Sequence, residues 1–201
     1  MKKRIRTHAN PLNFRDRLTQ YAKVVNQLDY NAIDLEIGFG RGRFIEAYSQ
    51  RYPERFLVGV EVRRNMVELL KSRIQYPNVL PIWGIAQTCL EDVISDDSLQ
   101  RVFIFHPDPW FKKRHHKRRV LTPDLLKCLH RKLAFNGQVF ISTDVPELHE
   151  DMLNLCQTYG NVELIENDPF WENDYMTHWS MFSVKDQRSQ HFISFKFKEN
   201  K

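Results

Sequence analysis

Short apolar runs alternate with amphipathic stretches along most of the chain. The apolar runs predict five strands, over residues 33–38, 56–61, 78–83, 101–105 and 138–142. Between these runs, apolar side chains recur at helical spacing and predict four helices, over residues 43–51, 64–73, 88–94 and 123–133. Such an alternation is typical of a parallel sheet that is covered by helices on both faces.

The two ends of the chain follow a different pattern. Near the N-terminus, one apolar face predicts an amphipathic helix within residues 12–28. Near the C-terminus, the pattern predicts a helix over residues 147–159 and strands over residues 162–165 and 191–198. Because no helix is expected between these two late strands, we predict that they form a hairpin that closes one edge of the sheet.

The predicted fold class is therefore α/β: a doubly wound, mostly parallel, Rossmann-like sheet with an antiparallel C-terminal hairpin strand. The chain has 201 residues, of which 42% are apolar, and no repeat or Gly/Ser-rich linker divides it. We expect a single domain over residues 1–201, in which residues 1–32 form a helical extension of a core over residues 33–201.

Composition excludes several classes of protein. No apolar run approaches the roughly 20 residues that cross a bilayer, and the charged start of the chain lacks the apolar stretch of a signal peptide. The three Cys residues, at positions 89, 128 and 156, are widely spaced, and the His residues show no metal-ligand spacing. We therefore expect a cytoplasmic protein with no disulfide, no metal and no membrane contact.

The net charge of +5 is concentrated in one segment, residues 112–119, which we call the basic run. This segment holds six Lys and Arg residues; removing these six from the 30 in the chain leaves 24, against 25 Asp and Glu. A local basic cluster indicates a polyanionic partner, although a solvated surface loop has the same composition.

Three of the seven glycines, Gly38, Gly40 and Gly42, lie between the first predicted strand and the first predicted helix. In a doubly wound sheet this turn lies at the crevice where nucleotide-like ligands bind. A dinucleotide fingerprint would place its third glycine at position 43, which is occupied by Arg43. The same glycines could also serve the turn alone.

Two acids flank this turn and narrow the choice of ligand. Glu36 precedes the first glycine by two residues, where an acid would repel a pyrophosphate but suits a cationic group. Glu61 ends the second strand, where a carboxylate can bind ribose hydroxyls. Together these features point to S-adenosylmethionine as the cofactor, because it carries a sulfonium, an ammonium group and a ribose but no phosphate.

The fourth predicted strand runs directly into His106-Pro-Asp-Pro-Trp110, and the basic run begins two residues later. The two prolines restrict the backbone around Asp108, at the end of a strand that faces the same crevice. A carboxylate, an aromatic ring and a polycation in one short segment are typical of a nucleic-acid active site. A simple turn with Trp110 in the core is the structural alternative.

The segment Phe105-His-Pro-Asp-Pro-Trp-Phe-Lys-Lys-Arg-His-His-Lys-Arg-Arg119 resembles the P-D-P-W-x-K-x-R-H-x-K-R-R signature of bacterial tRNA (guanine-N7-)-methyltransferases. The similarity extends to further short segments: Leu35–Gly40, Gly59–Glu61, Ser142–Asp144 and Met176–Thr177. The resemblance implies a class I S-adenosylmethionine-dependent methyltransferase whose catalytic core spans residues 33–201. Its substrate would be N7 of a guanine in the tRNA variable loop.

The resemblance also implies roles for individual residues. The cofactor would be bound by Glu36, Gly38, Gly40, Glu61, Ala86 and Asp108. Asp108 would be the catalytic residue, between the cofactor and the guanine. The substrate would be bound by Lys112, Arg114, Arg118, Arg119, Asp144, Thr177 and Ser180, with the three arginines on the tRNA backbone.

Two segments depart from the family pattern. Ile85-Ala86-Gln87 stands where an Asp-Ala pair commonly contacts the adenine, and Ser180 stands where the family has a glutamate that accepts from guanine. These departures keep other functions open: a methyltransferase with another RNA or a small-molecule substrate, or a non-catalytic RNA-binding protein on this fold. An NAD-linked oxidoreductase is a more distant alternative, disfavoured by Arg43.

Overall fold

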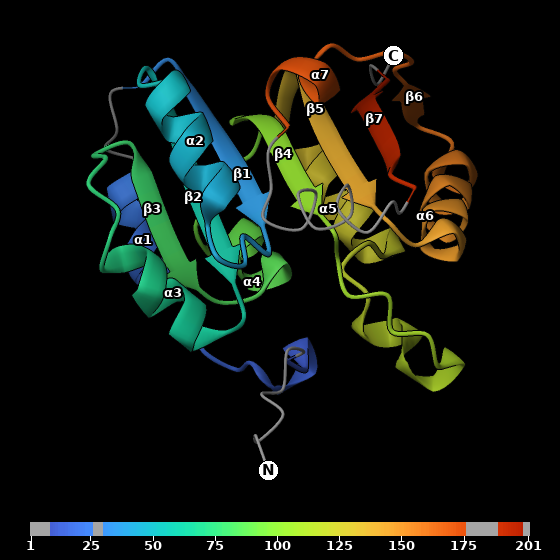
Figure 1. Ribbon diagram of the computed structural model, residues 1–201, viewed down its shortest axis with the longest axis horizontal. Coiled ribbons are helices and arrows are strands. Elements are labelled where there is room, and N and C mark those ends of the chain that lie inside the picture. Colours follow the sequence, from blue (N-terminus) through green and yellow to red (C-terminus); the bar gives the residue numbers. More distant parts are fainter. Residues whose placement is uncertain (1–8, 26–29, 176–188, 199–201) are drawn as a thin grey trace.

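The computed structural model describes residues 9–25, 30–175 and 189–198, and its seven strands form one sheet (Figure 1). The strands are β1 (Ala32–Ile37), β2 (Arg55–Glu61), β3 (Val79–Trp83), β4 (Leu99–Phe105), β5 (Leu133–Thr143), β6 (Val162–Leu164) and β7 (His191–Phe197). Their order across the sheet is β3-β2-β1-β4-β5-β7-β6. The first five strands are parallel, and β7 is antiparallel to β5 and β6. The predicted fold class is confirmed.

The helices form two layers that enclose the sheet (Figure 1). They are α1 (Thr19–Val25), α2 (Arg43–Arg51), α3 (Arg64–Lys71), α4 (Ala86–Asp92), α5 (Pro123–Lys132), α6 (Pro146–Tyr159) and α7 (Phe170–Asn173), with 3-10 helices η1 (Pro11–Asn13) and η2 (Lys113–Arg118). One layer, with α1, α4, α5 and α6, is mainly aliphatic, whereas the layer with α2, α3 and α7 is rich in aromatic side chains.

Alternation along the central strands fills both layers. In β4, Val102 and Ile104 belong to the aliphatic layer, whereas Phe103 and Phe105 belong to the aromatic layer. All four side chains are buried. Because such strands are covered on both faces, their sequences are nearly continuous apolar runs. These runs are what located the strands in the sequence.

The boundary between α5 and β5 differs from the prediction. The helix expected over residues 123–133 ends at Lys132, and β5 begins at Leu133 rather than at residue 138. The pair Asn136-Gly137 has the composition of a turn, but it lies inside the strand, with Asn136 at φ 60°. The pairing of β4 with β5 is irregular in this part of the ladder, which accommodates the left-handed residue.

The two ends also differ from the prediction. The helix expected within residues 12–28 is divided into η1 and α1, because the Leu18 N–H donates to the Asp92 carboxylate instead of continuing a helix. The one-turn helix α7 lies in the connection between β6 and β7, where no helix was expected. The two strands nevertheless pair antiparallel, as predicted.

The helices and the cysteines can be compared with what the composition predicts. None of the helices in the described part of the chain is long and apolar enough to cross a membrane. All three cysteines are free and buried, and burial raises the pKa of the Cys89 thiol to about 12.

Candidate active site

The carboxyl ends of the parallel strands bring the predicted acids to one end of the sheet. Glu36 lies near the end of β1, Glu61 ends β2, and Asp108 and Asp144 follow β4 and β5. Because β1 lies between β2 and β4, the connections leave to opposite faces at this point and open a crevice. A cavity of about 950 Å³ occupies it.

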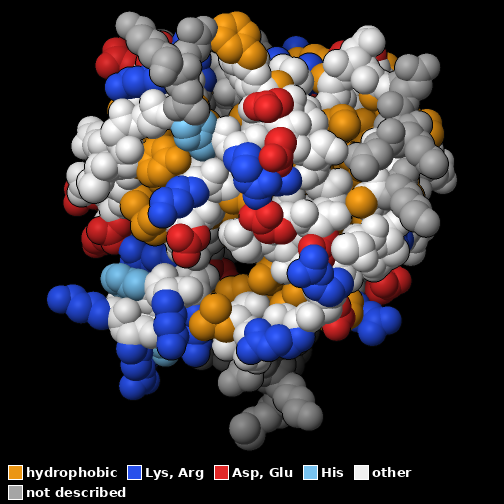
Figure 2. All heavy atoms as spheres, turned by 180° about the vertical axis from the view of Figure 1, so that it is seen from behind, with side chains coloured by type: hydrophobic (Ala, Val, Ile, Leu, Met, Phe, Trp, Pro, Cys, Tyr) orange, Lys and Arg blue, Asp and Glu red, His pale blue; other side chains and the backbone are white. Residues whose placement is uncertain are grey.

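Residues from distant parts of the chain line this cavity. Six predicted site residues are among them: Gly38, Glu61, Ala86, Asp108, Arg118 and Arg119. The other predicted residues within the described chain, which are not part of this lining, are Glu36, Gly40, Lys112, Arg114 and Asp144. Thr177 and Ser180 lie outside the described residues. Figure 2 shows a hollow in the lower half of the face turned to the viewer, with hydrophobic side chains in it and Lys and Arg side chains around it.

The glycine turn leaves space above the end of β1. Gly38 and Gly40 have φ values of 79° and 56°, which side chains with a Cβ adopt at a cost. The Gly38 N–H donates to the Val60 carbonyl at 2.7 Å, which ties the turn to β2. A Cβ built on Gly38 would meet no described atom within 4 Å, so this turn borders open space.

Glu61 is buried and fully engaged. Its carboxylate accepts the Gly40 N–H at 2.9 Å and the Arg63 N–H at 2.9 Å. The Arg63 guanidinium donates to both carboxylate oxygens, each at 2.9 Å. Glu61, with a smaller contribution from Asp108, raises the pKa of Arg63. Arg63 also lines the cavity, and its position two residues after Glu61 is the sequence signal that our prediction did not use.

Glu36 is equally buried but is not satisfied. Its exposed fraction is 3%, and its Oε2 atom has no hydrogen-bond partner among the described residues. Burial, together with the nearby Glu61, raises its pKa well above the usual range of a glutamate. A buried carboxylate in this state favours a ligand that supplies positive charge or a hydrogen-bond donor.

The start of α4 forms another part of the wall. Ile85, Ala86 and Gln87 all line the cavity. The Gln87 side chain lies 3.4 Å from Glu91, one turn further along α4, so its amide is directed along the helix. The wall that the family pattern assigns to the adenine is therefore formed largely by apolar side chains and backbone.

The N-terminal segment closes one side of the cavity, which the sequence analysis did not foresee. Its lining residues are Ala9, Pro11, Leu12, Phe14 and Arg15. The Phe14 ring packs edge-on against Trp83 with centroids 5.4 Å apart. This segment covers the cavity next to the carboxyl ends of β2 and β3.

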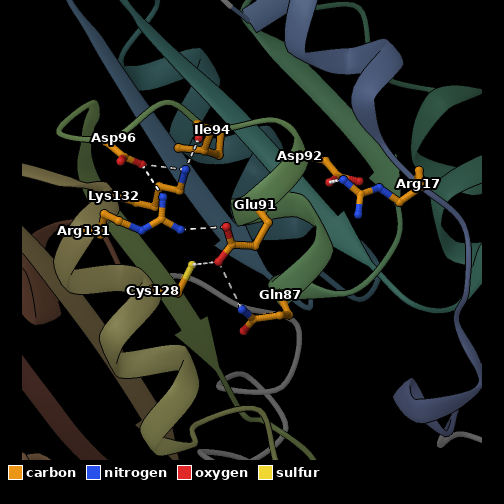
Figure 3. Close-up of polar contacts among 9 residues, drawn as sticks. All are labelled: Arg17, Gln87, Glu91, Asp92, Ile94, Asp96, Cys128, Arg131 and Lys132. Atoms are coloured by element: carbon orange, nitrogen blue, oxygen red, sulfur yellow. Dashed lines mark hydrogen bonds and ion pairs between the residues drawn. The ribbon is translucent and has the colours of Figure 1, made fainter.

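Asp92 at the end of α4 fastens this segment (Figure 3). It accepts the Leu18 N–H at 2.8 Å and pairs with Arg17 at 2.5 Å. On the neighbouring face of α4, Glu91 pairs with Arg131 of α5 at 2.7 Å, which lowers the pKa of Glu91 (Figure 3). The helix that carries the wall residues is therefore held from both sides.

The loop after β4 holds Asp108 between two residues with left-handed backbone. His106 and Trp110 have φ values of 46° and 45°. The His106 N–H donates to the Ser142 carbonyl, and its Nε2 lies 2.6 Å from the Tyr175 hydroxyl. Burial lowers the pKa of His106 to about 4, so the ring is neutral at physiological pH. These contacts fix the start of the loop, and none of them could be read from the sequence.

Asp144 faces this loop rather than the cavity. Its Oδ1 atom lies 3.7 Å from Nδ1 of His106, and only 9% of its side chain is exposed. From the resemblance, Asp144 is expected to contact substrate. The structure places it at the carboxyl end of the sheet, beside His106.

The basic run forms η2 and its flanks. Four of its cationic residues are exposed: Lys112, Lys113, Arg114 and Lys117. Arg118 and Arg119 are partly buried, and both line the cavity. The Arg118 guanidinium lies over the Trp110 ring, 5.0 Å from its centroid. The run therefore has an exposed side for a polyanion and an inner side toward Asp108.

Comparison with known proteins identifies the family. A family model described as "Putative methyltransferase" matches residues 30–194. The chain is 34% identical over 164 residues to the tRNA (guanine-N(7)-)-methyltransferase of Thermosynechococcus vestitus, which covers 78% of this chain and 76% of that protein. It is 30% identical over 198 residues to the protein of the same name from Prochlorococcus marinus, with 90% and 91% covered.

A solved structure supports the fold. The 16S rRNA methyltransferase KamB superposes with a TM-score of 0.63, at 14% identity, over 92% of this chain and 96% of KamB. At this identity the likeness shows the fold alone, whereas the sequence matches extend to the family. By those matches, the chain belongs to the bacterial tRNA (guanine-N7-)-methyltransferase family.

Proposed function

We propose that this protein transfers the methyl group of S-adenosylmethionine to N7 of a guanine in tRNA. One observation carries the proposal: a single cavity is lined both by Glu61 and Asp108 and by Arg118 of the basic run. A site for a cationic cofactor and a surface for a polyanion therefore share one space. The names of the relatives, which are tRNA (guanine-N(7)-)-methyltransferases, agree with this chemistry.

The two acids at the carboxyl ends of β1 and β2 fit S-adenosylmethionine. Glu36 has a buried Oε2 atom with no hydrogen-bond partner among the described residues, which suits the cationic end of this molecule. Glu61 ends β2, where ribose hydroxyls are bound in such sheets, and a ribose hydroxyl there would share or replace one of the Arg63 donors. Gly38, which lines the cavity, leaves open space at the turn after β1. When bound, S-adenosylmethionine supplies an electrophilic methyl group on its sulfonium. A phosphate beside Glu36 and Glu61 would meet two carboxylates, and the guanidinium beside them, that of Arg63, is already bound to Glu61.

Asp108 would position the guanine. N7 of guanine carries a lone pair and no proton, so the attacking atom needs no general base. The Asp108 carboxylate can accept N–H bonds from the base and offset the positive charge that develops on it, and this effect is strongest where water is excluded. The prolines and the left-handed residues on either side restrict the backbone that carries this carboxylate.

The basic run would hold the RNA. Its exposed cations, such as Lys112 and Arg114, can neutralise backbone phosphates, and Trp110 offers a ring beside the cavity. Bases in RNA are read where they are unstacked, so the target guanine would lie in an exposed segment such as the variable loop. Thr177 and Ser180, which lie outside the described residues, remain expected substrate contacts.

The proposal is tested by supplying purified protein with unmodified tRNA and S-adenosylmethionine that carries a tritiated methyl group. We expect incorporation of tritium and recovery of 7-methylguanosine after digestion, with the modified nucleotide mapped to the variable loop by chain cleavage at that base. Methyl incorporation at another atom, or only into another RNA, would assign the protein to a different methyltransferase reaction.

Isothermal titration with S-adenosylmethionine supplies the complementary measurement. Binding is expected, because Glu36 and Glu61 both lie at the carboxyl ends of their strands, beside the glycine turn. A protein that binds tRNA but shows no heat of cofactor binding would instead be a non-catalytic RNA-binding protein on this fold.

A further inference from the structure

Arg119 differs from the other cations of the basic run in what it touches. Its side chain is 15% exposed. Its Nη1 atom lies 2.6 Å from the carboxylate of Asp151 on α6, and its Nε donates to the Pro109 carbonyl at 2.9 Å. Its Nη2 atom lies 3.2 Å from Nε2 of His116. Each of its three guanidinium nitrogens therefore has a partner within the protein.

This arrangement leaves Arg119 poorly suited to bind a phosphate. A guanidinium presents its donors in a rigid fork, and here the fork joins a carboxylate on one element to a backbone carbonyl on another. A phosphate would have to displace Asp151, a charged partner, and leave the Pro109 carbonyl without this donor. Lys113, by contrast, is exposed and can reach a phosphate without such a loss.

Arg119 connects the loop that carries Asp108 to helix α6. Pro109 directly follows Asp108, whereas Asp151 lies on α6, whose Met152 is buried in the aliphatic layer. Between the loop and this helix lies a second cavity of about 340 Å³, which Asp108 also lines. The loop is thus not packed tightly against α6, and Arg119 bridges the two elements through defined hydrogen bonds.

We propose that Arg119 is a positioning residue: it joins the Pro109 carbonyl to Asp151 on α6 and so holds the loop that carries Asp108. The sequence pattern alone groups it with the arginines that would bind the tRNA backbone. This inference builds on the proposed methyl transfer, since that reaction gives Asp108 its role.

Asp151→Asn distinguishes the two roles without altering the basic run. Asp151 is 54% exposed, so the variant is expected to fold. If Arg119 holds the loop, loss of the ionic partner slows single-turnover methyl transfer at saturating tRNA by about 10-fold, since small displacements of a reacting group cost 10- to 100-fold in rate. If Arg119 is a phosphate-binding residue restrained by Asp151, the same variant frees it and steepens the salt dependence of tRNA binding.

Glu150→Gln is the matched control. Glu150 is the exposed neighbour of Asp151 on α6, and its substitution removes the same charge from the same helix. We expect wild-type rate and salt dependence from this control. Arg119→Ala should slow transfer at least as much as Asp151→Asn, and the double variant should be no slower than Arg119→Ala, because both changes break one connection. We also expect Arg119→Ala to leave the salt dependence of tRNA binding unchanged, because Arg119 would not contact a phosphate.

Amide hydrogen exchange provides a readout that does not depend on the reaction. Peptides covering residues 106–112 should exchange faster in Asp151→Asn and Arg119→Ala than in the wild type and in Glu150→Gln. Unchanged exchange, or a flattened salt slope with an unchanged rate at saturation in Arg119→Ala, would overturn the proposal. If the two variants exchange faster than the wild type but the wild type forms no 7-methylguanosine, the proposed function is contradicted and the loop-holding role of Arg119 is still supported.

Discussion

The acid pair, Glu36 and Glu61, and the basic run are both charged in sequence but lie in opposite settings. The two acids expose 3% and 2% of their surface, whereas residues 112–114 are exposed to solvent. Salt screens exposed charges over a Debye length of about 10 Å at 0.1 M and screens buried charges much less. We therefore expect cofactor binding to be nearly independent of salt and tRNA binding to depend on it steeply.

The same difference in burial suits the two regions to different tasks: the buried acids to selecting a ligand, and the exposed cations to binding RNA with little sequence preference. A buried carboxylate oxygen with no partner among the described residues, such as Oε2 of Glu36, favours a ligand that complements it. The exposed cations of the basic run can hold the backbone of any RNA. On the proposed function, the choice of guanine would fall to residues between the two regions, and Asp108 lies in the cavity wall there.

Asp108→Asn tests the point where the two regions meet, and its effect should be the largest. The amide keeps the size of the side chain but loses the charge that offsets the developing cation, so methyl transfer should fall by about 100- to 1,000-fold. Single-turnover incorporation of tritiated methyl into tRNA measures this loss. Cofactor binding by titration should stay at the wild-type level. Equal turnover of the two proteins would remove the assigned role.

Glu36→Gln tests the buried region and should have the next largest effect. Loss of the charged partner should weaken S-adenosylmethionine binding by about 10- to 100-fold, the range expected for hydrogen bonds to charged groups. Calorimetric titration at 50 mM and at 500 mM salt should give the same ratio of variant to wild-type dissociation constants. A ratio that collapses at high salt would show that Glu36 acts as a screened surface charge.

Lys112→Ala combined with Arg114→Ala tests the exposed region. Each lost phosphate contact should reduce the slope of log Kd against log salt by about 0.7 to 0.9 and weaken tRNA binding only several-fold. Binding isotherms at four salt concentrations measure the slope. Lys71→Ala, an exposed lysine at the end of α3, is the control and should leave the slope unchanged. A double variant with the slope of this control would place the RNA elsewhere.

The pH dependence of Glu36 should give the smallest effect. Its pKa is raised in the folded protein, so the stability that its protonated form contributes is present below the ordinary value of 4.5 and is lost as pH rises through the folded pKa. At neutral pH, Glu36→Gln should therefore raise the melting temperature of the cofactor-free protein, by about 2–4 °C for each kcal/mol. Melting curves from pH 5 to 8 should show a difference that grows with pH.

The raised pKa of Glu36 should also make the affinity for the cofactor depend on pH. A cationic ligand favours ionised Glu36, so its affinity should fall as pH is lowered toward the raised pKa. A Glu36→Gln protein should lose this dependence. If the variant and the wild type follow the same pH curve, another group controls the binding.

Much of the fold was accessible from the sequence because its signals are local. The boundaries of α2 agree with the prediction at both ends, since Gly42 precedes the helix and Pro53 follows it. The buried strands were visible as apolar runs. The start of β5 was missed because Asn136-Gly137 has turn composition, and only its pairing with β4 keeps this pair in the strand.

The sequence indicated individual residues of the site but not the tertiary contacts that hold them. Motif spacing indicated Glu36, Glu61 and Asp108, and the structure brings all three to the same end of the sheet. The contacts of His106 with Tyr175 and of Arg119 with Asp151 join residues 69 and 32 positions apart, and no local pattern encodes such pairs. The closure of the cavity by the N-terminal segment likewise depends on tertiary contacts, those of Leu18 and Arg17 with Asp92 and of Phe14 with Trp83.

The lining of the cavity has a kinetic consequence. Because the N-terminal segment and the basic run both border the space next to Glu61, an RNA seated on the basic run would cover part of the cofactor's route in and out. We expect a compulsory order, in which S-adenosylmethionine enters before tRNA and the spent cofactor leaves after the methylated tRNA. Each turnover would then include two successive product departures, so a single-turnover experiment is needed to measure the chemical step by itself.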